Sequence, residues 1–284
     1  MTKNILITKK SGDLESFKIE KLRNSLRRSG ADQKSIEIVI AEVNDFIQSG
    51  MSTQKVYRKA YSILSKLSHQ SAGRYRLKKA IMDLGPTGYP FERFIGAILE
   101  HQGYKVSIGK TIEGKCIKHE IDVLAEDEKN IIVIECKFHR AGNRKSDVKV
   151  PLYIHSRFND IYNRWIEEGR INNRKFKGWI VTNTRFTEDA EAYGRCSNLE
   201  LISWDYPKNN SLRQRIDRSG LHPITSLKTL NMKDKKVMLE QGIVLCREIT
   251  EEVLLKQRIP QNKIKKIMDE VCDITVCYEF PNNI

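Results

Sequence analysis

The sequence contains no run of about 18 apolar residues, the length that a membrane-spanning helix requires. Its first residues, Met1–Ile7, also lack the apolar core and the small-residue cleavage site of a secretion signal. We therefore expect a cytoplasmic protein without a membrane partner.

Motifs built on cysteine or glycine are scarce as well. The six cysteines form no Cys-x-x-Cys pair and have no histidine cluster beside them, which argues against a zinc site and a disulfide framework. Reduced, mostly buried thiols are the expected state. A Gly-x-x-x-x-Gly-Lys phosphate-binding loop is also absent, so nothing indicates ATP hydrolysis of that type.

Positive charge, in contrast, is abundant. The formal net charge is +14, and residues 1–85 contribute 17 Lys and Arg against 8 Asp and Glu, which is +9. This balance favours polyanionic partners such as nucleic acid or nucleotide phosphate, although basic surfaces also occur without such a role.

Punctuating residues divide the chain into three predicted modules. Residues 1–85 show the alternation of a hairpin with Gly12 in its turn, followed by about four helices. The break Gly85-Pro86-Thr87-Gly88 then leads into residues 86–220, where helices alternate with strands. That pattern predicts an α/β fold with a mixed sheet flanked by helices. Residues 221–284 form a small helical tail, either a helix-hairpin-helix module that contacts DNA phosphates or a packing domain.

Acidic and basic side chains are predicted to meet at one end of this sheet. Glu135 and Lys137 are two apart on an apolar strand, so they project from the same face while Cys136 points to the other, buried side. Asp122 lies on the preceding strand, which can pair with the first as a hairpin. Two carboxylates suit Mg²⁺, and a nearby lysine can orient an attacking water. Glu-x-Lys on an exposed strand is also common without catalysis, and this alternative stays open.

Four blocks in order along residues 89–205 support the catalytic interpretation. They are Tyr89-Pro90-Phe91-Glu92, Gly103-Tyr104-Lys105-Val106, Ile121-Asp122-Val123-Leu124-Ala125 and Ile134-Glu135-Cys136-Lys137. This set resembles the Mrr-like restriction endonucleases of the PD-(D/E)xK superfamily. The resemblance implies a restriction-endonuclease-like fold, Mg²⁺ bound by Asp122 and Glu135, water activation by Lys137, and a role for Glu92 in metal binding or proton transfer.

The chain departs from that family at two positions. Many members have glycine where this chain has Glu120, and glutamine often stands in place of Glu135. Glu120 shares a face with Asp122 and could be an extra ligand, an ion-pair partner or a solvated side chain. We expect it to be solvated.

A second resemblance covers residues 3–84. The string Ile5-Leu6-Ile7-Thr8-Lys9-Lys10-Ser11-Gly12, followed by Glu15, Phe17 and Glu20-Lys21-Leu22, resembles the ATP-cone, a regulatory nucleotide-binding domain. The resemblance implies that Ile7 contacts the base of ATP or dATP and that Lys9, Lys10 and Lys21 contact its phosphates. The usual Lys-Arg-Asp-Gly turn is Lys-Lys-Ser-Gly here. A basic hairpin exposed to water is the alternative.

These expectations combine into one hypothesis and one rival. The hypothesis is a magnesium-dependent endonuclease that hydrolyses double-stranded DNA in restriction or defence, with ATP or dATP as regulatory ligand. The rival is a non-catalytic, nucleotide-responsive regulator that binds nucleic acid. In either case the chain could act as a homo-oligomer.

Overall fold

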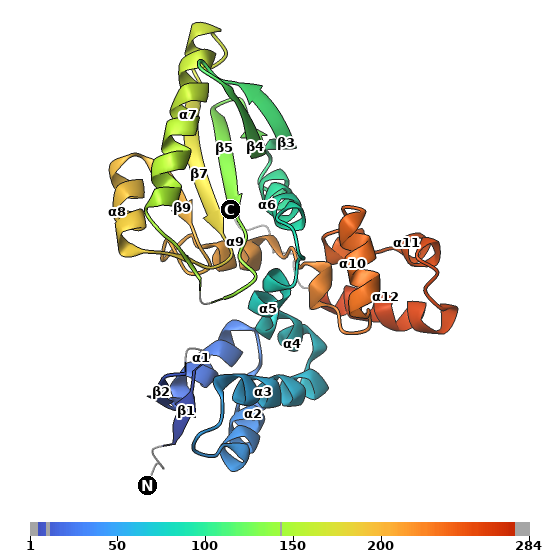
Figure 1. Cartoon of the computed structure of the whole chain (residues 1–284). Coiled ribbons are helices and arrows are strands. Elements are labelled where there is room, and N and C mark those ends of the chain that lie inside the picture. The colour runs from blue at the N-terminus through green and yellow to red at the C-terminus, as the bar shows by residue number, and fades with distance from the viewer. Residues whose placement is uncertain (1–4, 10–11, 143, 276–284) are drawn as a thin grey trace, which may run out of the picture. The chain divides into compact units, whose positions relative to one another are not determined.

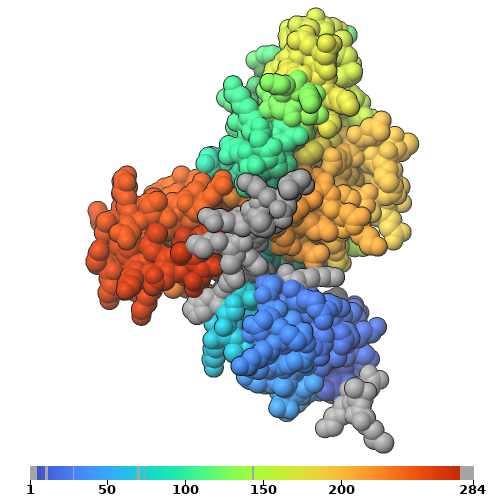
Figure 2. Space-filling view, turned by 180° about the vertical axis from the view of Figure 1, so that it is seen from behind, coloured from blue at the N-terminus to red at the C-terminus, as the bar shows by residue number. Residues whose placement is uncertain are grey.

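The computed structural model of the chain describes residues 5–9, 12–142 and 144–275 (Figure 1, Figure 2). The chain divides into two compact units, and it enters each of them more than once. The first comprises Met1–Ala80, Ser226–Leu230 and Ile249–Ile284, and the second comprises Ile81–Thr225 and Asn231–Glu248. Among the described helices, none is long and apolar enough to cross a membrane.

The first unit opens with the predicted hairpin. Strands β1 (Leu6–Thr8) and β2 (Leu14–Ser16) pair antiparallel, with Ile7 opposite Glu15. Gly12 in the turn has a φ of 93°, in the left-handed region that residues with a side chain rarely adopt. Among the described residues of the two strands, Ile7 is the buried one, and it packs against the helices that follow.

Four helices complete the N-terminal part of this unit. They are α1 (Ile19–Arg28), α2 (Gln33–Phe46), α3 (Thr53–Leu67) and α4 (His69–Tyr75). Asp32 caps α2 by accepting the N–H of Ser35 at 2.7 Å, and Ser52 caps α3 by accepting the N–H of Lys55 at 3.3 Å. One apolar core runs through all four helices.

Helices from the end of the chain belong to the same unit. They are α11 (Glu251–Lys256) and α12 (Gln261–Thr275), and α12 packs on α4. The buried carboxylate of Glu270 accepts the backbone N–H of Lys228 at 2.7 Å and that of Thr229 at 2.8 Å. These bonds hold the short segment Ser226–Leu230 in the first unit.

Residues of the predicted tail, 221–284, occur in both units. The first helical elements of this tail lie partly or wholly in the second unit. In the same unit, Pro223 forms an isolated β-bridge with Leu245. These elements are η1 (Ile224–Ser226), α10 (Met232–Glu240) and η2 (Cys246–Glu248).

The second unit is built on a five-stranded mixed sheet in the order β3-β4-β5-β7-β9. The strands β3, β4 and β5 form an antiparallel meander, and β7 and β9 run parallel to β5. The bounds are β3 (Lys105–Glu113), β4 (Lys118–Glu126), β5 (Asn130–Lys137), β7 (Lys175–Thr182) and β9 (Leu199–Ile202), with β6 (Lys145–Ser146) and β8 (Arg185–Phe186) forming a separate pair. The predicted α/β class with a mixed sheet is confirmed.

Helices cover both faces of the sheet. Trp179 and Val181 of β7 meet Ile95 and Ile98 on one face, whereas Ile180 faces the other. The helices that cover the sheet are α6 (Tyr89–His101) on the first face and α7 (Lys149–Glu167) and α8 (Glu188–Cys196) on the second. Helix α9 (Leu212–Ser219) lies beside α6. A further helix, α5 (Leu77–Met82), precedes α6.

Candidate active site

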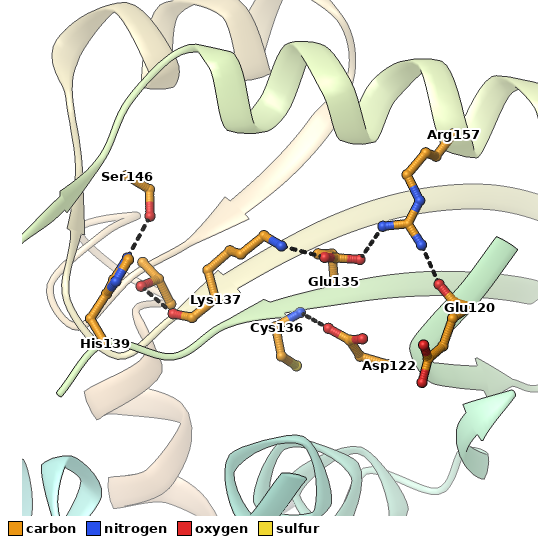
Figure 3. Close-up of polar contacts among 9 residues, drawn as sticks. Glu120, Asp122, Glu135, Cys136, Lys137, His139, Ser146 and Arg157 are labelled. Carbon is orange, nitrogen blue, oxygen red and sulfur yellow. Dashed lines mark hydrogen bonds and ion pairs between the residues drawn. The ribbon is translucent and has the colours of Figure 1, made fainter. Parts of the chain in front are cut away.

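The candidate site lies where β4 and β5 separate. The strands pair as far as Val123 and Ile134, and the next residues are Asp122 on β4 and Glu135 on β5. There the Asp122 carboxylate accepts the N–H of Cys136 at 2.7 Å, taking the place that a backbone carbonyl would have in a continuing ladder. The separation gathers polar side chains of both strands at one end of the sheet (Figure 3).

A glycine sets the direction of Asp122. Ile108 pairs with Val123 and Lys110 with Ile121, so Gly109 lies opposite Asp122, and it has a φ of 63°. Regular alternation would put Ile108 and Ile112 on the same face of the sheet. In the structure Ile108 packs toward α6, whereas Ile112 belongs to the core on the other face, which includes α7. The strand therefore changes face at Gly109. Asp122 lies at this irregular point and turns out of the regular pleat.

Glu135 is held between two cations. Its side chain is only 7% exposed, and its two oxygens accept bonds from Lys137 Nζ at 2.5 Å and from Arg157 Nη1 at 2.8 Å (Figure 3). Arg157 comes from α7 and also donates to the backbone carbonyl of Glu120. Since a buried carboxylate is unfavourable without such partners, Arg157 fixes Glu135 and ties α7 to both separating strands.

Glu92, on the first turn of α6, joins this group electrostatically. Burial, and after it the nearby carboxylates of Asp122, Glu120 and Glu135, together raise its pKa to about 7, against the opposing effect of Lys137. Four side chains that the sequence singles out, Glu92, Asp122, Glu135 and Lys137, are therefore close enough to influence one another. A carboxyl group with a pKa near neutrality can hold or release a proton under physiological conditions.

Asp122 and Cys136 experience the same surroundings. Burial, followed by the charge of Glu135, raises the pKa of Asp122 to about 6, although the Cys136 amide and the cations Lys137 and Arg157 act in the opposite sense. Burial also raises the pKa of the Cys136 thiol, and Asp122 and Glu92 add to that effect. Cys136 is thus a protonated, buried thiol, as its place on the strand predicts.

The donor set suits a hard divalent cation. Asp122 and Glu135 offer carboxylate oxygens from adjacent strands, and the pKa of Asp122 is raised by burial and then by the charge of Glu135. Within the described residues no group of three His, Cys, Asp or Glu is arranged to hold a metal ion. Mg²⁺ commonly uses one or two carboxylates and fills its other positions with water and substrate oxygens, so two ligands fit it. The side chain of Glu120 is exposed, as expected.

Polar groups behind the site fix the end of β5. Thr182 on β7 is fully buried and its hydroxyl donates to the carbonyl of Lys137 at 2.7 Å. Asn183 accepts the N–H of His139 at 2.8 Å and donates to its carbonyl at 2.8 Å. The His139 ring pairs with Ser146 at 3.0 Å, and burial lowers its pKa, so the imidazole is neutral near pH 7.

Sequence reasoning did not find Arg157. The residue lies one turn before Ile161 and next to Phe158 on an amphipathic helix, which is a common place for a surface arginine that covers apolar neighbours. A signal exists only after the fold is known, because α7 must first be placed over β5. With α7 in that position, the carboxylate that pairs with Arg157 is Glu135.

The first unit brings most of the predicted nucleotide residues together. Lys9 and Lys21 both pair with Glu15, at 2.8 and 2.6 Å, and the hydrogen bond from Lys21 and then that from Lys9 lower the pKa of Glu15 to about 2. Ile7 and Lys21 line a cavity of about 240 Å³. Lys10, the fourth predicted residue, lies outside the described residues.

Aromatic side chains form another wall of this cavity, and sequence reasoning missed them. The rings of Tyr57 and Tyr75 stack with centroids 4.9 Å apart, and the Tyr57 hydroxyl donates to the carbonyl of Tyr75 at 3.2 Å. Phe17 lines the same space. Pockets for whole drug-sized ligands are usually about 300–1,000 Å³, so this cavity has the size for a base more than for a complete nucleotide.

Comparison with known proteins places the chain in a family. A family model described as AF1548-like, C-terminal, matches residues 222–275. An uncharacterized protein of Archaeoglobus fulgidus is 31% identical over 179 residues, which cover 61% of this chain and 95% of that protein. The chain belongs to the AF1548-like family. The remaining 39% of the chain (100 − 61) lies outside that alignment.

One solved structure agrees with this assignment. The crystal structure of AF1548, a protein of unknown function, is 27% identical with a TM-score of 0.55, and the match covers 67% of this chain and 99% of that one. The structure of Can2 from Sulfobacillus thermosulfidooxidans in complex with cyclic tetra-adenylate has 14% identity and a TM-score of 0.32, over 70% of this chain and 54% of that one. The AF1548-like family thus supplies a shared fold, and function has to be argued from the site.

Proposed function

We propose that this AF1548-like protein is a magnesium-dependent endonuclease that hydrolyses phosphodiester bonds in double-stranded DNA. One observation carries the proposal: Asp122 and Glu135 adjoin the last paired residues of β4 and β5, and Lys137 Nζ lies 2.5 Å from Glu135. In agreement with this grouping, burial and the carboxylates of Asp122, Glu120 and Glu135 raise the pKa of Glu92. Carboxylates that raise one another's pKa are unfavourable for stability, and such groups gather at sites that bind cations or perform proton transfer. A positively charged lysine, Lys137, lies among them.

Each side chain has a role that its surroundings allow. Asp122 and Glu135 would hold Mg²⁺, which supplies positive charge to a phosphate oxygen and lowers the pKa of an attacking water. Lys137 is partly exposed and orients that water after it exchanges its bond to Glu135. Glu92, with a pKa of about 7, accepts or returns a proton near neutral pH. Arg157 keeps the Glu135 carboxylate in place.

Nucleotide regulation is the second part of the proposal. Lys9 and Lys21 exchange Glu15 for the phosphates of ATP or dATP, and the base enters the cavity beside Ile7 and the stacked tyrosines. The basic balance of residues 1–85 attracts the ligand. A role in restriction or defence, in the cytoplasm, belongs to the same proposal.

A non-catalytic regulator is the alternative, and one feature favours it. Both oxygens of Glu135 are engaged by cations of the chain itself, Lys137 and Arg157, which is a satisfactory arrangement without metal. In that case the charged cluster stabilises the fold, and the two units bind nucleic acid and nucleotide without hydrolysis.

A plasmid cleavage assay separates the two. Modified and unmodified plasmids are incubated with Mg²⁺, with and without ATP or dATP, using the full chain, Lys137→Ala, and Lys118→Ala as a matched control. Lys118 is also a lysine of this sheet, but it is 69% exposed and pairs with Glu113 away from the cluster. We expect cleavage by the wild type and by Lys118→Ala, and a loss of at least about 10²-fold in Lys137→Ala. Equal activity of the two variants, or no cleavage under any condition, would reject the catalytic assignment.

A further inference from the structure

A second cavity in the second unit lies outside the groups discussed so far. It has a volume of about 550 Å³, within the usual range for small-molecule sites. One wall is the segment between α5 and α6, another is α10, and Arg140 after β5 closes a third side. The contribution of α10 matters because this helix lies within the 222–275 match that defines the AF1548-like tail.

The walls are predominantly apolar and include a broad aromatic ring. Leu84 is fully buried and Leu239 is 5% exposed, so both belong to the floor. Tyr89 and Met232 line the cavity and are 45% and 57% exposed, which leaves their side chains accessible. Flat aromatic rings and flexible thioethers are suitable surfaces against which a nucleobase can pack.

Three cationic side chains also line the cavity. Lys235, which is 3% exposed, Lys236 and Arg140 all line the cavity, together with two acidic residues, Asp83 and Glu240. Lys236 lies 3.7 Å from Glu240, a weak exposed pair on one helix, so its ammonium can exchange this partner for a phosphate.

Short connections link this cavity to the candidate active site. Pro90 lines the cavity and Glu92 follows two residues later, with its Oε1 3.0 Å from the position that a Cβ on Gly88 would take. On the opposite side, Arg140 comes three residues after Lys137. The two places therefore share the start of α6 and the end of β5.

We infer that this cavity binds one nucleotide unit, with the base against the apolar walls and the phosphate at Arg140 and Lys236. The nucleotide has two sources that the same chemistry would accept. It is either a nucleotide of the bound DNA strand that has left the base stack, a step that costs a few kcal/mol, or a free nucleotide. The inference gives the family tail a function, because α10 forms one side of the site. It does not require that the chain cleaves DNA.

Fluorescence of 2-aminopurine tests the inference, because its emission changes with the stacking of the base in a duplex and its anisotropy rises when the free monophosphate is bound. The full chain is mixed, with Ca²⁺ in place of Mg²⁺, with duplexes carrying 2-aminopurine at successive positions, and separately with 2-aminopurine deoxyriboside 5′-monophosphate. Met232→Trp should fill the cavity, and Leu255→Trp is its matched control, a 53% exposed apolar residue on α11. Lys236→Glu is matched by Lys256→Glu, since each lysine forms an exposed pair with a glutamate one turn away.

We expect a probe signal in the wild type and both controls, and about tenfold weaker binding in Met232→Trp and Lys236→Glu. A signal confined to the duplex identifies a nucleotide of the substrate, and a signal confined to the monophosphate identifies a free ligand. No signal with either probe, or equal binding by the cavity variants and their controls, overturns the inference. The proposed function fails separately, by absence of cleavage with Mg²⁺ while the monophosphate still binds in a Met232-dependent manner.

Discussion

Replacing Asp122 with asparagine should make the metal-free second unit more stable at alkaline pH while it abolishes cleavage. The ionised carboxylate is partly buried beside Glu135, which is why its pKa is raised to about 6. Asparagine keeps an oxygen that can accept the N–H of Cys136, so the hydrogen bond that ends the pairing of β4 and β5 can persist. The substitution therefore removes mainly the unfavourable charge.

The size of the effect follows from the pKa. A folded-state value of about 6 against an unfolded value of about 3.9 corresponds to roughly 3 kcal/mol, and exposure of the side chain reduces this to about 1–2 kcal/mol. Because the folded-state pKa is raised, the folded state binds the proton more tightly. This group therefore lowers the stability of the wild type as pH rises from about 4 to about 7. The advantage of Asp122→Asn should be small near the lower end of this window and complete above it.

Tryptophan fluorescence during urea unfolding measures the stability of the second unit, which contains Asp122. All three tryptophans, Trp165, Trp179 and Trp204, belong to the second unit. Chelator is added first, and Mg²⁺ is then titrated. Bound metal should stabilise the wild type by mass action and leave Asp122→Asn unchanged, so the order of stability should reverse with metal.

Asp127, in the turn between β4 and β5, provides a control in which the pKa shift, and with it the effect on stability, has the opposite sign. Desolvation raises its pKa, but hydrogen bonds from Asn130 and from the amide of Lys129 outweigh this, and the net pKa is lowered. Asp127→Asn should therefore lose stability at alkaline pH. The reasoning is refuted if Asp122→Asn is the less stable protein without metal at about pH 8, or if its advantage does not vary with pH.

Three further predictions concern other parts of the molecule. Arg157→Ala should destabilise the metal-free second unit by about 3 kcal/mol in urea unfolding, because it leaves the buried Glu135 with one cation fewer; Arg157→Lys should recover part of this. Gly109→Ala should cost about 1–2 kcal/mol, since its φ of 63° is unfavourable with a side chain, and it should reduce cleavage by turning Asp122. Lys21→Ala should weaken ATP binding about tenfold in calorimetry, whereas Lys59→Ala on α3 should not.

Local patterns were sufficient for much of the site and the sheet. Strand alternation puts Glu135 and Lys137 on one face, and the apolar run before them indicates a buried strand, as the structure has it. The full length of β3 could not be predicted from local sequence patterns. β3 runs from Lys105 to Glu113, because pairing with β4 carries the chain through the irregular Gly109.

Long-range contacts account for what the sequence did not predict. The sequence predicts about four helices after the hairpin, and the structure has α4 and α5 as separate helices at the end of this region. The tail reads as one module because its helices follow each other with short turns. Glu270, however, accepts amide bonds from Lys228 and Thr229 about 40 residues earlier, which fixes part of the tail in the first unit. No local pattern contains that hydrogen bond.

The distribution of charge indicates where a cation would first bind. Glu135 already has Lys137 and Arg157 as partners, so a metal gains little there before one of these bonds is exchanged. Asp122 accepts a bond from a neutral amide, and its pKa, like that of Glu92, is raised by burial and by neighbouring carboxylates. The charge of Asp122 is therefore less compensated than that of Glu135. Asp122 and Glu92 would hold a divalent ion first, giving up any proton they carry, and Lys137 would then exchange its bond to Glu135 for one to the attacking water.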